Sequence, residues 1–137
     1  MAQTYKANVS QDSIKMLNTK IELLKTNKKI FELKVKESEE ESEIEKLRLK
    51  LLEANVKAKA SAQETNTYSS KTVSGSTIDM KSMDKMSMKV KGDVIEARKA
   101  LQRFNKQVSK VEDIRSQIKA EERKISYRKS AITFSYD

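Results

Sequence analysis

The residues with the greatest capacity for chemistry in this 137-residue chain are carboxylates, hydroxyls and amines, because the sequence has no histidine and no cysteine. Without imidazole or thiol ligands, the usual zinc and haem sites and a Ser-His-Asp triad are excluded. The densest group of carboxylates is Glu39, Glu40, Glu41 and Glu43. This group lacks the glycine turn and the alternating oxygen ligands of a calcium loop. We therefore interpret it as a solvated or ion-pairing face, and we predict no metal site and no cofactor.

Two segments match the Ser-x-x-Lys pattern of penicillin-binding enzymes, in which a serine acts as the nucleophile. They run from Ser82 to Lys85 and from Ser126 to Lys129. The companion motifs are absent, and nothing in the sequence predicts the sheet that would form a pocket around such a serine. We attribute both matches to chance, predict no catalytic residues, and expect a protein that is not an enzyme.

The net charge of +9 favours anionic partners, including nucleic acid. Acidic residues are interspersed among the basic ones, and aromatic residues do not alternate with them as stacking on single strands requires. We therefore favour a solvated, ion-paired face over nucleic-acid binding, which stays an alternative. The basic residues concerned are Arg98, Lys99, Arg103, Lys106, Lys110, Arg115, Lys119, Arg123, Lys124, Arg128 and Lys129.

The composition indicates which elements must carry these groups. Hydrophobic residues make up 36% of the chain and charged residues another 36%, with no proline and only two glycines. High charge with few helix-breaking residues is typical of long helices and coiled coils. Apolar residues never run beyond two in succession, so we expect no membrane span. We also predict no signal peptide, and a location in the cytoplasm or within a particle assembled there.

We predict an N-terminal arm over 1–10 and a long first helix over 11–64. Two apolar stripes run along this helix with the three-four spacing of a coiled coil, and they differ in phase. Such a change of phase resembles a stutter, in which the packed seam moves around the helix. The first stripe is Ile14, Leu17, Ile21, Leu24, Phe31 and Val35, and the second is Ile30, Leu33, Ile44, Leu47, Leu51, Ala54 and Ala58.

A Ser/Thr-rich loop is predicted over 65–78, because these side chains compete with helical hydrogen bonds and Gly75 permits a reversal. A second long helix is predicted over 79–126, where eleven of fourteen positions at three-four spacing between Met80 and Ile125 are apolar. Polar and apolar residues alternate from Ser130 to Tyr136, which is typical of a strand. We therefore predict an extended C-terminal tail over 127–137.

The predicted fold class is all-α, with two long helices in an antiparallel helical hairpin or coiled coil. Placing Glu64 opposite Asp79 sets the acidic residues 37–45 against the basic segment 98–106, although Arg115 then approaches Lys28. The pairing can occur within one chain or between copies. The predicted helix-pairing residues are Ile14, Leu17, Ile21, Leu24, Ile44, Leu47, Leu51, Val94, Leu101, Phe104, Val108, Val111, Ile118 and Ile125.

Two groups of residues are predicted to bind partners. Met86 and Met88 fall outside the predicted stripe of the second helix and can form an adaptable apolar surface. Ile132, Phe134 and Tyr136 of the tail can add a strand to the edge of a partner's sheet, or pair with this chain's own N-terminal arm.

In outline the chain is similar to several helical-hairpin classes. These are the stalk proteins of flagellar and type III export machines, prefoldin-like chaperones, and small helical proteins of virus particles. The likeness implies a structural component of a large assembly, such as a virion or a secretion apparatus, that is anchored through its termini and associates with copies of itself. A chaperone or export stalk that binds proteins transiently is the first alternative, and a basic nucleic-acid packaging protein is the second.

Overall fold

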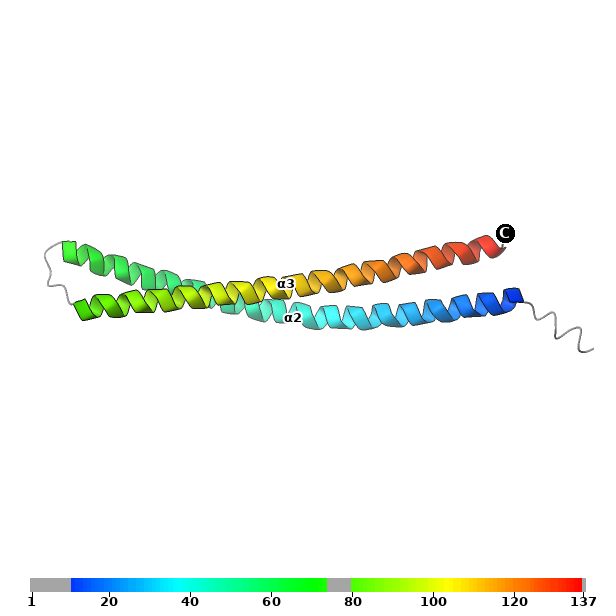
Figure 1. Ribbon diagram of the computed structural model, residues 1–137, viewed down its shortest axis with the longest axis horizontal. Helices are drawn as coiled ribbons and strands as arrows, with labels where there is room; N and C mark the ends of the chain where they lie inside the picture. The colour runs from blue at the N-terminus through cyan, green and yellow to red at the C-terminus, as the bar shows by residue number, and fades with distance from the viewer. Residues whose placement is uncertain (1–10, 74–79, 137) are drawn as a thin grey trace, which may run out of the picture. The chain divides into compact units, whose positions relative to one another are not determined.

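The computed structural model describes the backbone of residues 11–73 and 80–136, and the side-chain environments of residues 11–69 and 80–128. Two α-helices make up this part of the chain: α2 spans Gln11–Val73 and α3 spans Met80–Tyr136. They run antiparallel and pack against each other, which confirms the predicted all-α helical hairpin (Figure 1). The predicted N-terminal arm, 1–10, residues 74–78 of the predicted loop, residue 79 and residue 137 lie outside the described residues.

Helix α2 continues nine residues beyond Glu64, so the predicted loop is wrong for residues 65–73. The hydroxyls that were expected to break the helix bond back to it instead. Thr65 Oγ1 donates to the carbonyl of Ser61 at 2.9 Å, and Thr67 Oγ1 donates to the carbonyl of Gln63 at 2.9 Å. A hydroxyl that bonds to the carbonyl four residues earlier satisfies its own polarity without displacing the helical backbone.

Helix α3 continues through the tail, so the extended conformation predicted for 127–137 is wrong for residues 127–136. An alternation of seven residues is short, and no glycine or proline after Gly92 marks an end to the helix. Extending an existing helix fixes one residue for each hydrogen bond gained, whereas starting a new element needs a costly nucleus. Propagation therefore prevails over the local strand-like pattern.

Both helices are uninterrupted over their described lengths. The acidic stretch 37–45 lies within α2, as we predicted, and Gly92 lies within α3. A side chain at Gly92 would meet no atom within 4 Å, so close packing does not require glycine there. Among the described residues, neither helix has a stretch apolar enough to cross a bilayer.

Residues in contact divide into two units, each containing part of both helices. The terminal unit comprises 1–39 and 111–137, and the loop unit comprises 40–110. In the terminal unit, the start of α2 lies beside the end of α3 (Figure 1). Ile30, Ile114 and Ile118 form its buried core, with Leu33 and Ile125 packed against them.

The loop unit has a thinner seam, made largely of small and half-buried side chains. No apolar residue of this unit is fully buried among those described. The half-buried apolar residues of its α2 segment are Ile44, Leu47, Leu51, Ala54, Ala58 and Tyr68, and those of its α3 segment are Met86, Val90, Val94, Ala97, Ala100, Phe104 and Val108.

In the terminal unit, the packed face of α2 is the backward continuation of the second stripe. Counting back from Leu33 and Ile30 in three-four steps reaches Thr26, Leu23, Thr19 and Met16, which are all buried or half-buried. The first stripe is on another face, and its predicted pairing residues Ile14, Leu17, Ile21 and Leu24 are 47–69% exposed. These four residues therefore do not pair with α3 of the same chain, and their pairing with another copy stays a prediction. Over residues 11–69 the packed row of α2 keeps one phase, so the predicted stutter is not seen there.

The predicted stripe of α3 contains one of the two packed rows. Phe104, Val111, Ile118 and Ile125 lie on the seam. The second row is displaced by one residue from the prediction, so that Ala100 is half-buried where Leu101 had been predicted, and Leu101 is 46% exposed. The displaced row is Asp93, Ala100, Gln107, Ile114, Glu121 and Arg128, which is mostly polar or small and therefore gave no apolar signal.

The two helices pair about one heptad away from the predicted register. In the predicted register, Glu64 faces Asp79, so the residue numbers of any two opposed positions add to 143. The structure instead pairs Lys29 with Glu121 in the terminal unit, and Lys57 with Asp93 in the loop unit, and each pair adds to 150. The longer α2 moves the turn toward the C-terminus, which accounts for the direction of the change. The predicted clash is thereby removed, because Arg115 meets Glu37 at 3.9 Å instead of Lys28.

Candidate interaction surface

A row of apolar side chains on α2 of the terminal unit faces away from α3. We call this row the outer stripe. Its positions follow the three-four spacing of a coiled-coil seam without interruption, and one of them is Lys28. The exposed fractions are 51% for Ile14, 59% for Leu17, 47% for Ile21, 69% for Leu24, 69% for Phe31 and 44% for Val35.

The helical repeat explains why α3 cannot cover both faces. Each outer-stripe position precedes a seam position by two residues, as Ile14 precedes Met16 and Ile21 precedes Leu23. Two residues correspond to roughly 200° of rotation around a helix of 3.6 residues per turn, so the two rows lie on nearly opposite sides. A single partner helix can bury one of them. The contact with α3 therefore leaves the outer stripe exposed.

The seam of the terminal unit contains a buried carboxylate with one partner on its own helix and one on the facing helix. Glu121 is 7% exposed, and its Oε1 lies 3.2 Å from Nζ of Lys124 and 3.2 Å from Nζ of Lys29. The hydrogen bond from Lys124, followed by that from Lys29, lowers the pKa of Glu121 below its ordinary value of 4.5. Lys124 is on the same helix and accompanies Glu121 in any register, whereas Lys29 comes from α2, so the contact with Lys29 favours one register over its neighbours.

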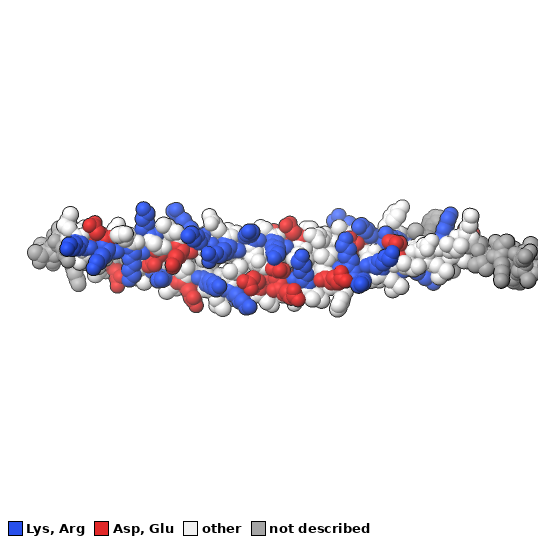
Figure 2. All heavy atoms as spheres, turned by 60° about the horizontal axis from the view of Figure 1, so that its bottom comes forward, with Lys and Arg blue, Asp and Glu red and all other residues white. Residues whose placement is uncertain are grey.

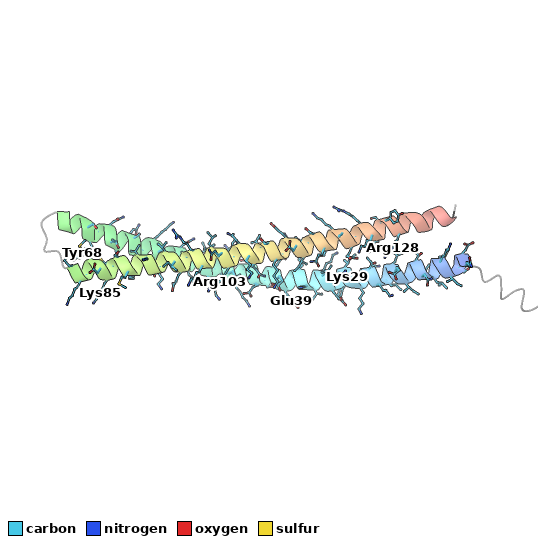
Figure 3. The ribbon with its side chains drawn as sticks, in the orientation of Figure 1. Lys29, Glu39, Tyr68, Lys85, Arg103 and Arg128 are labelled. Atoms are coloured by element: carbon cyan, nitrogen blue, oxygen red, sulfur yellow. The ribbon has the colours of Figure 1, made fainter. Side chains whose placement is uncertain are left out.

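A second polar contact lies one heptad further along α3. Arg128 Nη1 donates to Thr26 Oγ1 at 2.8 Å and to the backbone carbonyl of Glu22 at 3.3 Å. Thr26 in turn donates its hydroxyl proton to the same carbonyl at 2.8 Å. Lys29 and Arg128 are labelled on the facing helices in Figure 3. The described part of this seam thus alternates apolar layers with charged contacts.

The loop unit has its own buried polar contact. Ser61 is 3% exposed and donates a hydrogen bond to Oδ2 of Asp93, which is 7% exposed. Lys57 Nζ lies 3.8 Å from the other carboxylate oxygen of Asp93 and 3.7 Å from Glu96. The hydrogen bond between Ser61 and Asp93 gives each side chain a polar partner, so both can be buried in the seam.

The acidic stretch supplies partners to basic residues of α3. Glu37 pairs with Arg115 in the terminal unit, and Glu40 pairs with Lys110 at 3.2 Å in the loop unit. Gln107 donates to the backbone carbonyl of Glu40 at 3.0 Å. Across residues 11–73 and 80–136, no cluster of three acidic side chains has the arrangement of a metal site. Ser82 and Ser126, from the two Ser-x-x-Lys matches, both lie inside α3.

The basic residues of α3 share their surface with acids. On the face shown in Figure 2, aspartate and glutamate side chains lie among those of lysine and arginine. Of the basic residues singled out in the sequence, those with described side chains include four with an acidic partner within 4.0 Å: Lys110, Arg115, Lys124 and Arg128. Such mixing reduces the continuous positive potential that a phosphate backbone would follow.

The predicted partner-binding residues are placed differently from one another. Met88 is 74% exposed, whereas Met86 is half-buried and lines a surface pocket together with Ala60 and Tyr68 of α2. Met80, which the sequence pattern had placed on the core stripe, is 71% exposed. The backbone of Ile132, Phe134 and Tyr136 is helical, which removes the geometry required for adding a strand to a sheet. Their side chains lie outside the described ones.

Sequence reasoning missed the polar residues of the seam. Thr26, Ser61, Asp93, Gln107 and Glu121 occupy positions that an apolar count passes over. Continuing the α2 row through Ile30 and Leu33 in three-four steps, without requiring apolar residues, reaches Thr26 in one direction and Ser61 in the other.

Comparison of the chain with protein-family models, with curated proteins and with solved structures found no match.

Proposed function

We propose that this chain is a non-enzymatic structural protein, a coiled-coil component of a large assembly that associates with other protein chains, including copies of itself. The outer stripe is the observation that carries the proposal. Contiguous apolar patches that remain exposed on a folded protein mark interaction sites, because burying them is favourable. Here the exposed side chains also have coiled-coil spacing, which suits a helix as the partner.

The thinness of the hairpin core supports the same proposal. Only four apolar residues among those described are buried: Ile30, Val111, Ile114 and Ile118. Small or thin folds obtain additional stability by oligomerising or by docking onto a larger body. A component of a particle, virion-like or secretion-apparatus-like and assembled in the cytoplasm, fits this need.

The test of this role is incorporation. We expect the full chain to co-sediment with its assembly from host cells, and a chain lacking residues 130–137 to remain helical by circular dichroism but to be left out. The reason is the proposed anchoring through the termini. A tagged full-length chain that sediments only as a free protein in its own host would contradict a structural role.

The exposed methionines favour a second candidate, a stalk or chaperone that binds proteins transiently. Met80 and Met88 are 71% and 74% exposed in the loop unit, and methionine adapts to irregular partner surfaces. Replacing both with serine distinguishes the candidates, because a transient binder should lose client capture while a structural component should still be incorporated.

Nucleic-acid packaging ranks below both, because the described basic residues are interspersed with acids. Titration of DNA binding against salt tests it. A steep loss of affinity with rising salt would revive packaging, whereas weak binding without a salt slope would remove it.

A further inference from the structure

The outer stripe has the side-chain order of one particular coiled coil. Taking Ile14 as the first position of a heptad places Ile14, Ile21, Lys28 and Val35 at the first positions and Leu17, Leu24 and Phe31 at the fourth. β-Branched residues at the first position with leucine at the fourth favour two parallel strands, because their side chains enter the partner helix in different orientations at the two layers.

We propose that the outer stripe binds the outer stripe of a second copy of this chain, with the two α2 helices parallel and in register. This inference rests on the proposed function and names the partner of its surface. In such a dimer, α2 of the terminal unit has α3 on one side and the second α2 on the opposite side.

The outer stripe offers a continuous apolar surface to a dimer. Its six apolar side chains are 44–69% exposed. In a coiled coil the residues that flank the stripe also enter the contact, and an interface of ~800 Å² per partner is typical of a stable complex.

Lys28 gives the pairing its specificity. It is the one polar residue in the stripe between Ile14 and Val35, and it stands at a first position. A single lysine at such a position selects register and chain number at some cost in stability, because only an arrangement that lets its ammonium group reach water is tolerated.

Of the charged pairs that flank the stripe, one favours the parallel register and one opposes it. Lys34 and Glu39 are five residues apart and flank the stripe on its two sides, so in a parallel dimer each lysine faces the glutamate of the other copy. Lys34 is already 4.0 Å from Glu122 within the chain, but both side chains are more than half exposed and can exchange partners. Lys20 and Lys25 form the equivalent pair two heptads earlier and oppose the association.

The first measurement is the molar mass of the full chain in solution over a range of concentrations. We expect twice the 15.7 kDa of one chain, falling to one chain on dilution. Leu24→Lys should abolish the dimer, because it places a second charge in the stripe at a position that is 69% exposed in the single chain. Leu101→Lys is the matched control on α3 and should leave the dimer intact. Circular dichroism should show that both variants remain helical.

Orientation is tested with a single introduced cysteine, since the chain has none of its own. In a parallel dimer in register, Leu17→Cys brings two identical positions within the ~4.4–6.8 Å between Cα atoms that a disulfide requires. We expect a covalent dimer under oxidising conditions, and a several-fold tighter but less specific association for Lys28→Ile.

Three results would overturn the inference. They are a single chain at all concentrations, a dimer that Leu24→Lys leaves intact, and a dimer in which Leu17→Cys forms no cross-link. The last indicates an antiparallel pair. A chain that is monomeric yet enters its assembly in the incorporation test would refute this partner while leaving the proposed function standing.

Discussion

Lys29 on α2 places its Nζ 3.2 Å from Oε1 of Glu121 on α3, and Glu121 is 7% exposed at a seam position. A register that moved Lys29 away would leave the buried carboxylate of Glu121 with Lys124 of its own helix alone, so the contact disfavours such registers. The ion pair between Lys29 and Glu121 is thus one determinant of how α2 and α3 are aligned in the terminal unit.

Acid should weaken the contribution of Glu121. Its pKa is lower in the folded chain than the ordinary value of 4.5, so its contribution to stability is present above that pH and is lost as the pH falls through the folded pKa. Glu121→Gln should lower the melting temperature at pH 7, and the difference from the unmodified chain should shrink below about pH 4.5. Glu122→Gln is the control, because its contact with Lys34 is 4.0 Å and exposed. A difference that is the same at pH 7 and pH 3 would contradict the assignment.

Truncation of the core should cost far more than truncation of an exposed position with the same side chain. Ile114→Ala removes methyl groups from a site that is 3% exposed, and should lower the free energy of unfolding by about 2–4 kcal/mol. Ile95→Ala on the same helix, where the side chain is 41% exposed, should cost under about 1 kcal/mol. Urea unfolding followed by circular dichroism measures both. Equal losses would mean that Ile114 is not in the seam.

The buried pair in the loop unit should behave as a unit. Asp93→Ala leaves the Ser61 hydroxyl without its partner and should destabilise the chain by about 1–3 kcal/mol. Adding Ser61→Ala should recover part of this loss, because no buried polar group is then left unsatisfied. A thermodynamic cycle of the two single variants and the double variant gives the coupling free energy. A coupling of zero would show that the two side chains do not interact in solution.

Gly92→Ala should stabilise the chain by about 0.5–1 kcal/mol, because alanine loses less backbone entropy in a helix interior. The structure permits the change, since an added Cβ at this position meets no atom within 4 Å. The adjacent Lys91→Ala is the control and should be close to neutral. A destabilised Gly92→Ala would indicate that α3 departs from regular helix at this point.

The sequence by itself determined that this chain folds into two long antiparallel helices, because it lacks proline and keeps apolar residues at three-four spacing over long stretches. It also predicted that α2 has two apolar rows. It did not determine which row packs against α3, since Ile14, Leu17 and Ile21 satisfy the spacing as well as Ile30, Leu33 and Ile44 do.

The contacts between α2 and α3 decide which row is packed. In the observed register, Ile30 of α2 packs against Ile114 and Ile118 of α3, and Lys29 pairs with Glu121. The outer stripe lies on the opposite face of α2 and therefore stays exposed. The helix ends also required the structure, because Thr65 and Thr67 can bond to carbonyls within a helix as readily as they can break one. Spacing within one helix is a local property, whereas the pairing of two helices depends on contacts between residues about ninety apart in the chain, as Lys29 and Glu121 are.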